Sequence, residues 1–151
     1  MTIRVATKTD VQAIVEMIAN DKLGSLREDY RKPLPENYFA AFQNIANDPN
    51  QELVVIEDVN LKVIGTMQLS FIQYLTYQGG IRAQIEAVRV HKDYRGKGIG
   101  KKLFKWAITR AKEKKAHIVQ LTTDKKRTDA VAFYEKLGFK ASHEGMKLHL
   151  I

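Results

Sequence analysis

A turn rich in glycine and basic residues, Arg95-Gly96-Lys97-Gly98-Ile99-Gly100, has the clearest chemical potential in the sequence. It follows an apolar stretch typical of a strand and directly precedes apolar residues at helical spacing. Glycines let the backbone approach an anion closely, and the first N–H groups of a helix point toward it with the helix dipole behind them. The turn therefore predicts a phosphate-binding site, although its spacing matches neither the P-loop nor the dinucleotide-binding fingerprint.

The excess positive charge of the chain lies at this turn and just after it. The formal net charge is +8, and residues 92–115 alone hold ten Lys and Arg against two Asp and Glu. Such a patch fits a compact polyanion, either a nucleotide phosphate cluster or a nucleic acid, and it also fits a solvated helix face. Because no zinc spacing, RNP motif or helix-turn-helix pattern accompanies it, we expect no nucleic-acid partner.

Composition narrows the chemistry further. The absence of cysteine excludes disulfides, thiolate metal sites and a cysteine nucleophile. The four histidines show no metal-ligand spacing, so we expect no metal site. No apolar run reaches the length of a membrane span, and the first residues lack the apolar core of a secretory signal. We therefore expect a cytoplasmic protein without a membrane partner.

The periodicity of apolar residues predicts a single domain over residues 1–151, of the mixed α/β class. Strands are expected over residues 3–5, 52–57, 62–73, 83–90, 117–123 and 146–150. Helices are expected after Asp10, between Pro35 and Pro49, over about 99–115 and over 128–137. The third of these helices lies between two strands and predicts a crossover connection.

Two segments resemble the signatures of one enzyme family. Arg95-x-x-Gly98-x-Gly100 resembles the [RQ]-x-x-G-x-[GA] motif of the GNAT superfamily of N-acetyltransferases, and Ala130-Val-Ala-Phe-Tyr-Glu-Lys-Leu-Gly-Phe139 resembles its second motif. The predicted order of elements agrees along nearly the whole chain. The resemblance implies a single-domain GNAT-like fold with a mixed central sheet of about six to seven strands and about four helices. It also implies that strands 85–90 and 117–123 splay apart at a bulge and form a cleft for CoA.

The resemblance implies acetyl-CoA as the acetyl donor. Backbone groups of Val88, Arg89 and Val90 are expected to pair with its pantetheine arm. The pyrophosphate is expected on the segment made of Arg95, Gly96, Lys97, Gly98, Ile99, Gly100 and Lys101.

The resemblance also implies direct transfer without an acyl-enzyme. Tyr134 matches the family tyrosine near the CoA sulfur and is the expected proton donor. Glu86, a carboxylate in an otherwise apolar strand, is the candidate base, and an ordered water is the alternative base. If Glu86 has only a structural role, its charge faces outward or forms an ion pair with Arg82 or Arg127. Arg127 stands where the family often has asparagine, and it could reach either a phosphate or a substrate carboxylate.

In this family the segment between the first two helices walls the acceptor site. Its mixed charges predict a small polar amine, amino-acid-like, with Arg27 holding a carboxylate and an acid such as Glu28 holding the ammonium group. A peptide or protein amine is the second candidate acceptor, and a CoA-binding protein without turnover is the alternative function. Segment 74–82 is expected to form either a second wall of the acceptor site or a dimer contact, so a homodimer is possible.

Overall fold

The computed structural model describes residues 1–151 and contains one mixed sheet of five strands, with the order β1-β2-β3-β4-β5. Neighbouring strands are antiparallel except for β4 and β5, which are parallel. The strands are β1 (Thr2–Val5), β2 (Gln51–Glu57), β3 (Val63–Gln73), β4 (Ile81–Val90) and β5 (Ile118–Gln120). The mixed α/β class and the crossover into a parallel strand are therefore confirmed.

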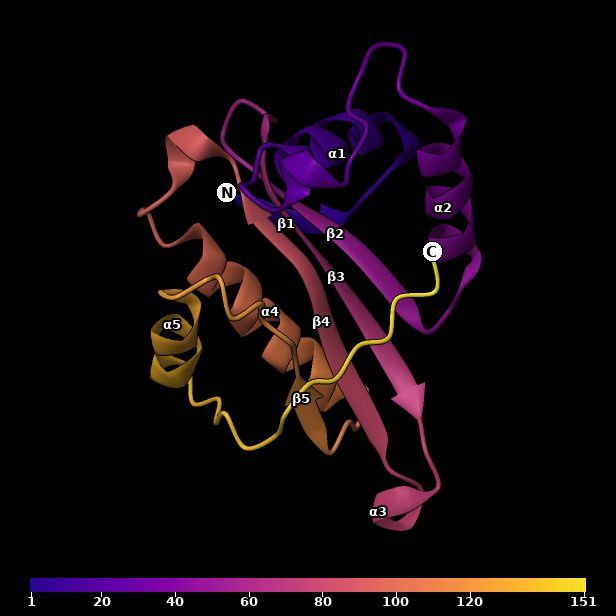
Figure 1. Ribbon diagram of the computed structural model, residues 1–151, viewed down its shortest axis with the longest axis vertical. Helices are drawn as coiled ribbons and strands as arrows, with labels where there is room; N and C mark the ends of the chain where they lie inside the picture. Colours follow the sequence, from indigo (N-terminus) through magenta and orange to yellow (C-terminus); the bar gives the residue numbers. More distant parts are fainter.

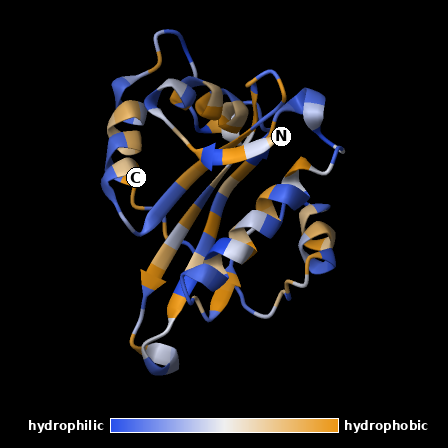
Figure 2. Cartoon of the chain, turned by 180° about the vertical axis from the view of Figure 1, so that it is seen from behind, coloured by the Kyte–Doolittle hydropathy of each residue, from blue (hydrophilic) through white to orange (hydrophobic).

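Helices cover both faces of the sheet, with α1 and α2 on one face and α4 and α5 on the other (Figures 1 and 2). They are α1 (Val11–Ala19), α2 (Glu36–Asn47), α3 (Thr76–Gly79), α4 (Ile99–Glu113) and α5 (Ala130–Lys136). The short α3, in the connection between β3 and β4, was not expected from the sequence. None of the helices has the length and apolarity needed to cross a bilayer.

The alternation of strand residues divides the core into two layers. Val54 and Ile56 of β2 pack with the apolar side of α4 in the main cluster, whereas Val55 between them packs with Ile14 of α1. All three β2 residues are at most 1 % exposed. Because both faces of the central strands are covered, the sheet can hold the site rigidly between its helical layers.

A nearly buried carboxylate joins β1 to the start of α1. Asp10 accepts a bidentate pair from Arg4, with Nη1–Oδ2 at 2.7 Å and Nη2–Oδ1 at 3.0 Å, and a hydrogen bond from the backbone N–H of Thr7 at 2.7 Å. Arg4 also reaches Glu57 of β2 at 3.1 Å. Asp10 stands at the predicted N-cap of α1, but its side chain bonds backward to the preceding turn.

Two strand predictions fail toward the C-terminus. The segment 117–123 keeps only the three residues of β5, and the expected strand over 146–150 is absent, so the sheet has five strands rather than six or seven. Met146 and Leu148 alternate as in a strand, yet they are 94 % and 87 % exposed. The last residues run as extended chain across the view in Figure 1. Alternation predicts an extended backbone, whereas a strand also needs a neighbour to bond, and this segment has none within the chain.

Candidate active site

The parallel strands β4 and β5 separate soon after they meet. Their pairing runs from Arg82–Ile118 to Gln84–Gln120 and then stops. Beyond that point a cavity of about 530 Å³ opens between the two strands and the start of α5. Its lining includes 85–89 of β4 and 121–124 after β5, so the splayed cleft predicted from the sequence is confirmed.

A β-bulge marks the point where β4 leaves its regular pairing. Ala87 has a φ of +52°, a left-handed conformation that costs a residue with a side chain about 1–2 kcal/mol. The register with β3 shifts there, because Glu86 lies opposite Gln68 whereas Arg89 lies opposite Thr66. Directly opposed residues of an antiparallel pair project to the same face. The extra residue therefore puts the side chains of Glu86 and Arg89 on one face, the face covered by α1 and α2.

Glu86 lines the cavity and is oriented by two glutamines. The Nε2 of Gln84 donates to its Oε1 at 3.1 Å, and the Nε2 of Gln120 donates to the Oε1 of Gln84 at 2.8 Å. Glu86 makes no ion pair with Arg82 or Arg127, because Arg82 stacks on Tyr74 at 4.8 Å and Arg127 pairs elsewhere. Glu86 is an exposed side chain at the lining of the cavity, and its role as base remains a prediction.

Tyr134 of α5 reaches the same cavity from the opposite wall. Its ring packs against Phe104 and Phe139, with centroids 5.6 Å and 6.2 Å away, and its hydroxyl has no hydrogen-bond partner in the protein. Burial raises the pKa of Tyr134, while the charges of Arg127 and Arg89 act in the opposite direction. The phenol is therefore protonated near neutral pH and can donate a hydrogen bond into the cavity.

Arg127 forms an ion pair that no sequence pattern predicted. Its Nη1 and Nη2 donate to the two carboxylate oxygens of Asp21 at 2.8 Å and 2.6 Å, and the Nη2 of Arg89 lies 3.6 Å from the same carboxylate. The hydrogen bonds from Arg127 hold the pKa of Asp21 far below its usual range. The pair ties the loop after α1 to the loop before α5.

The glycine turn joins β4 to α4 and continues the line of the cleft. Gly96 and Gly98 have φ values of +74° and +79°, and a Cβ added at either would meet no atom within 4 Å. This space and the unpaired N–H groups at the start of α4 suit an approaching anion. The side chain of Arg95 points elsewhere, because its Nε and Nη2 donate to the carbonyls of Val90 at 3.3 Å and Asn20 at 3.4 Å.

The predicted cofactor residues divide into two sets. Val88 and Arg89 line the cavity itself, whereas Val90 and the turn residues Arg95, Gly96, Lys97, Gly98, Ile99, Gly100 and Lys101 lie beyond its lining. The carbonyl of Val88 accepts from Nη1 of Arg89 at 2.7 Å. Their contacts with CoA remain predictions.

The two acceptor residues predicted from the loop after α1 differ in position. Arg27 lines the cavity, whereas Glu28 does not and instead lies 3.9 Å from the Nε of Arg27. Sequence reasoning missed Gln84, although its spacing of two residues from Glu86 in a strand already indicated a shared face. It also missed Thr123, whose buried Oγ1 lacks a partner, because nothing local distinguishes that threonine.

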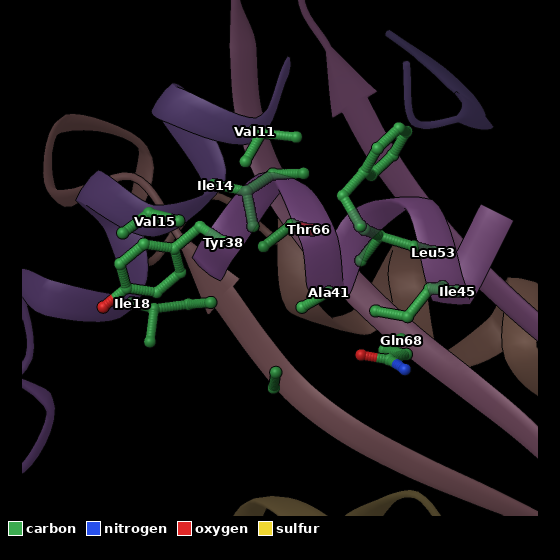
Figure 3. A pocket seen from close by; sticks show the side chains of 12 residues that line it. Val11, Ile14, Val15, Ile18, Tyr38, Ala41, Ile45, Leu53, Thr66 and Gln68 are labelled. Carbon is green, nitrogen blue, oxygen red and sulfur yellow. The ribbon is translucent and has the colours of Figure 1, made fainter. Parts of the chain in front are cut away.

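A second, apolar cavity of about 120 Å³ lies between α1, α2 and β3 (Figure 3). Its walls include Ile14, Tyr38 and Leu53, and Figure 3 shows these side chains converging on one space. Ala87 lines both cavities. The bulge therefore separates a polar cavity from an apolar one. The chain has no cluster of three or more His, Cys, Asp or Glu side chains suited to a metal ion.

The splayed parallel strands, the bulge and the glycine turn define an acyl-donor cleft of the acetyltransferase type. Residues 20–139 match the acetyltransferase (GNAT) family, and the chain belongs to that family. The resemblance inferred from the two sequence motifs is thereby confirmed.

Known proteins similar to this chain include enzymes and a protein named for regulation. A solved structure from Bacillus halodurans C-125, described as a transcriptional regulator, is 54 % identical over 99 % of both chains with a TM-score of 0.96. An aminoalkylphosphonate N-acetyltransferase of Salmonella typhimurium is 34 % identical over 56 % of this chain and 54 % of its own. A glucosamine 6-phosphate N-acetyltransferase of Trypanosoma brucei brucei is 34 % identical over 59 % of this chain and 58 % of its own. The chain thus spans a little over half of these two enzymes.

Proposed function

We propose that the protein transfers the acetyl group of acetyl-CoA to the primary amine of a small polar, amino-acid-like molecule, by direct attack in a ternary complex. The observation that carries this proposal is the cavity between β4 and β5, which Glu86 and Tyr134 line together. It places a carboxylate and a protonated phenol around one space beside a phosphate-binding turn.

The residues present suit the donor. Gly96 and Gly98 leave the turn open, and Lys97 and Lys101 supply charge beside the first N–H groups of α4. The edge of β4 that faces the cavity has no strand partner after Gln84, so it can bond the amide groups of a pantetheine arm as a strand would. These features support CoA rather than a bare phosphate.

The two side chains then have complementary tasks. Glu86 accepts a proton from the acceptor ammonium, directly or through a water, and the neutral amine attacks the thioester carbonyl. A C–N bond forms and the C–S bond breaks, and Tyr134 protonates the leaving thiolate. The second proton that the amine nitrogen loses then reprotonates Tyr134, and Glu86 releases the first proton to solvent. The Gln120–Gln84–Glu86 hydrogen bonds hold the carboxylate toward the cavity.

Thiol release from acetyl-CoA with a panel of amines tests the proposal. Glu86→Gln should lower kcat/KM by about 10-fold to 100-fold if the carboxylate is the base, and by little if an ordered water suffices. Glu135→Gln, on α5 but outside the cavity lining, is the matched control. Tight CoA binding with no turnover of any amine would instead identify a CoA-binding protein without catalysis.

The acceptor is proposed to be a small molecule because the two enzymes similar to this chain are named for small amines, an aminoalkylphosphonate and glucosamine 6-phosphate. A peptide or protein amine is the second acceptor class, and acetylation of a lysine-containing peptide in preference to every small amine would favour it.

A regulatory role in nucleic-acid binding is a second candidate function. The regulator name of the Bacillus halodurans structure and the basic segment 92–115 favour it. Melting temperatures with acetyl-CoA and with duplex DNA at moderate salt separate the two functions. We expect stabilisation by acetyl-CoA, and stabilisation by DNA alone would contradict the enzymatic proposal.

A further inference from the structure

Three arginines from three different segments line the acceptor side of the cavity. Arg27 comes from the loop after α1, Arg89 from β4 beyond the bulge, and Arg127 from the loop before α5. Their positions in the sequence are far apart, so their convergence is a property of the fold. A guanidinium group presents N–H donors in a planar fork that matches the oxygens of carboxylates, phosphonates and phosphates.

Of these three guanidinium groups, only that of Arg127 has a carboxylate within hydrogen-bonding distance. Asp21 is shared by Arg127 at 2.6 Å and Arg89 at 3.6 Å, and Arg27 has only the distant Glu28 at 3.9 Å. The side chain of Arg89 is 15 % exposed, and its buried Nε has no hydrogen-bond partner. Burial lowers the pKa of Arg89, and the charges of Arg127 and Arg27 add to this effect against the attraction of Asp21. Arg27 and Arg89 therefore keep guanidinium N–H groups that no carboxylate of the protein bonds, although Asp124 and Asp129 line the same cavity.

The bulge places this cluster next to the reaction centre. Glu86 and Arg89 lie opposite Gln68 and Thr66, which are two residues apart on β3 and face the same side. At the rise of a strand, their points of attachment are about 7 Å apart along the sheet. Arg127 and Arg89 also lie close enough to Tyr134 to affect the pKa of its phenol.

We propose that Arg27, Arg89 and Arg127 form an oxyanion subsite for the acceptor, so that the enzyme selects primary amines that also carry a carboxylate, phosphonate or phosphate group. The inference rests on the proposed function and names the acceptor class of that same site. The amine lies at Glu86 and the anion at the arginines, so the two groups are joined by a short spacer of about two or three carbon atoms. Asp21 holds Arg127 and Arg89 in place when no acceptor is bound.

The phosphates of CoA have a separate cationic site. The glycine turn with Lys97 and Lys101 lies beyond the cavity lining, at the start of α4, whereas Arg27 and Arg127 belong to the loops that line the cavity. Changes at Arg27 and Arg127 should therefore affect the acceptor and leave the donor unaffected.

The test compares amines that are matched in length and differ in charge. The acidic amines are 2-aminoethylphosphonate and β-alanine, which separate the phosphonate and carboxylate forms of the oxyanion, and the neutral ones are 3-amino-1-propanol and propylamine. We expect kcat/KM for at least one acidic amine to exceed that of both neutral amines by about 10-fold or more. Arg127→Gln should remove this preference without raising the KM for acetyl-CoA.

Arg31→Gln is the matched control, because Arg31 lies outside the cavity, is 67 % exposed and pairs only with Asp29. Melting temperatures show whether Arg127→Gln remains folded. Arg27→Gln repeats the test without loss of the Asp21 ion pair, and Arg127→Lys repeats it with the charge retained. Arg127→Lys keeps the charge but not the fork, so it should recover only part of the preference.

Three results would overturn the subsite: equal turnover of acidic and neutral amines, a raised KM for acetyl-CoA in Arg127→Gln with the preference intact, or no calorimetric binding of either acidic amine to the CoA complex. Binding of 2-aminoethylphosphonate that is lost in Arg127→Gln, but without turnover of any amine, would support the subsite and refute the proposed acetyl transfer.

Discussion

Replacing Tyr134 by phenylalanine removes one oxygen atom from the cavity and changes little else. The ring keeps its packing, with Phe104 at 5.6 Å and Phe139 at 6.2 Å between centroids. The hydroxyl has no hydrogen-bond partner in the protein, so its loss leaves no buried group unpaired. We therefore expect the free energy of unfolding to change by less than about 1 kcal/mol.

The expected effect on turnover is much larger. A positioned proton donor contributes about 10²- to 10⁴-fold to a rate, which corresponds to about 3–5 kcal/mol of barrier. Burial keeps the pKa of Tyr134 above its usual value, so the wild-type phenol remains a donor throughout the neutral range. The donor can act only when the thiolate forms, so kcat should fall while the affinity for acetyl-CoA remains within about threefold.

The assay is steady-state thiol release with saturating acetyl-CoA and a turned-over amine, combined with calorimetric binding of acetyl-CoA. Tyr77→Phe is the control, because Tyr77 is exposed on α3, stacks on His117 and lies outside the cavity. Full turnover in Tyr134→Phe, or a fall in kcat matched by an equal loss of acetyl-CoA affinity, would refute the role of proton donor.

Three further changes are expected to have distinct effects. Gly98→Val forces a β-branched residue to a φ of +79° at a point where the backbone must approach the phosphates. The Kd of acetyl-CoA, measured by calorimetry, should therefore rise by more than about tenfold. The kcat at saturation, measured by steady-state kinetics, should be nearly unchanged. Asp10→Asn should lose about 2 kcal/mol at pH 7 in urea unfolding, and this loss should become smaller as the pH falls below about 4. Burial alone would raise the pKa of Asp10, but hydrogen bonds from Arg4 and Thr7 outweigh the effect of burial and lower this pKa. The Asp10 carboxylate therefore contributes its full stabilisation of the fold above the unfolded pKa of about 4, and this stabilisation is lost as the pH falls. Finally, we expect a homodimer that covers the exposed Leu148 and Leu150, and light scattering should show Leu148→Lys to be monomeric; a monomeric wild type would contradict this.

The elements that could be predicted are those whose pattern is local and long. The helix from residue 99 was predicted because Ile99, Leu103 and Ala111 recur on one side, and the first two of these are at most 2 % exposed in α4. The long strand β3 was predicted from alternation in the same way. The segment 146–150 has the same alternation, but whether it becomes a strand depends on a partner edge, which periodicity does not describe.

The same distinction applies to the site. The glycine turn is local, so residue types alone predicted an anion-binding turn, and Gly96 and Gly98 have the positive φ values that glycine allows. The ion pair between Arg127 and Asp21 joins residues 106 positions apart, and no pattern in either segment predicts it. The sequence therefore identifies Arg127 as a departure from the family motif but does not predict Asp21 as its partner.

The bulge at Ala87 explains why the acceptor side of the cleft could not be derived from the sequence. In a regular strand, residues three apart project to opposite faces, so Glu86 and Arg89 would not meet one ligand. The left-handed backbone at Ala87 reverses this parity, at a cost of about 1–2 kcal/mol. The same residue interrupts the regular pairing with β3, which resumes at Arg89, and borders both cavities. One strained residue therefore puts Glu86 and Arg89 on a single face, and the proposed base and the proposed subsite both depend on it.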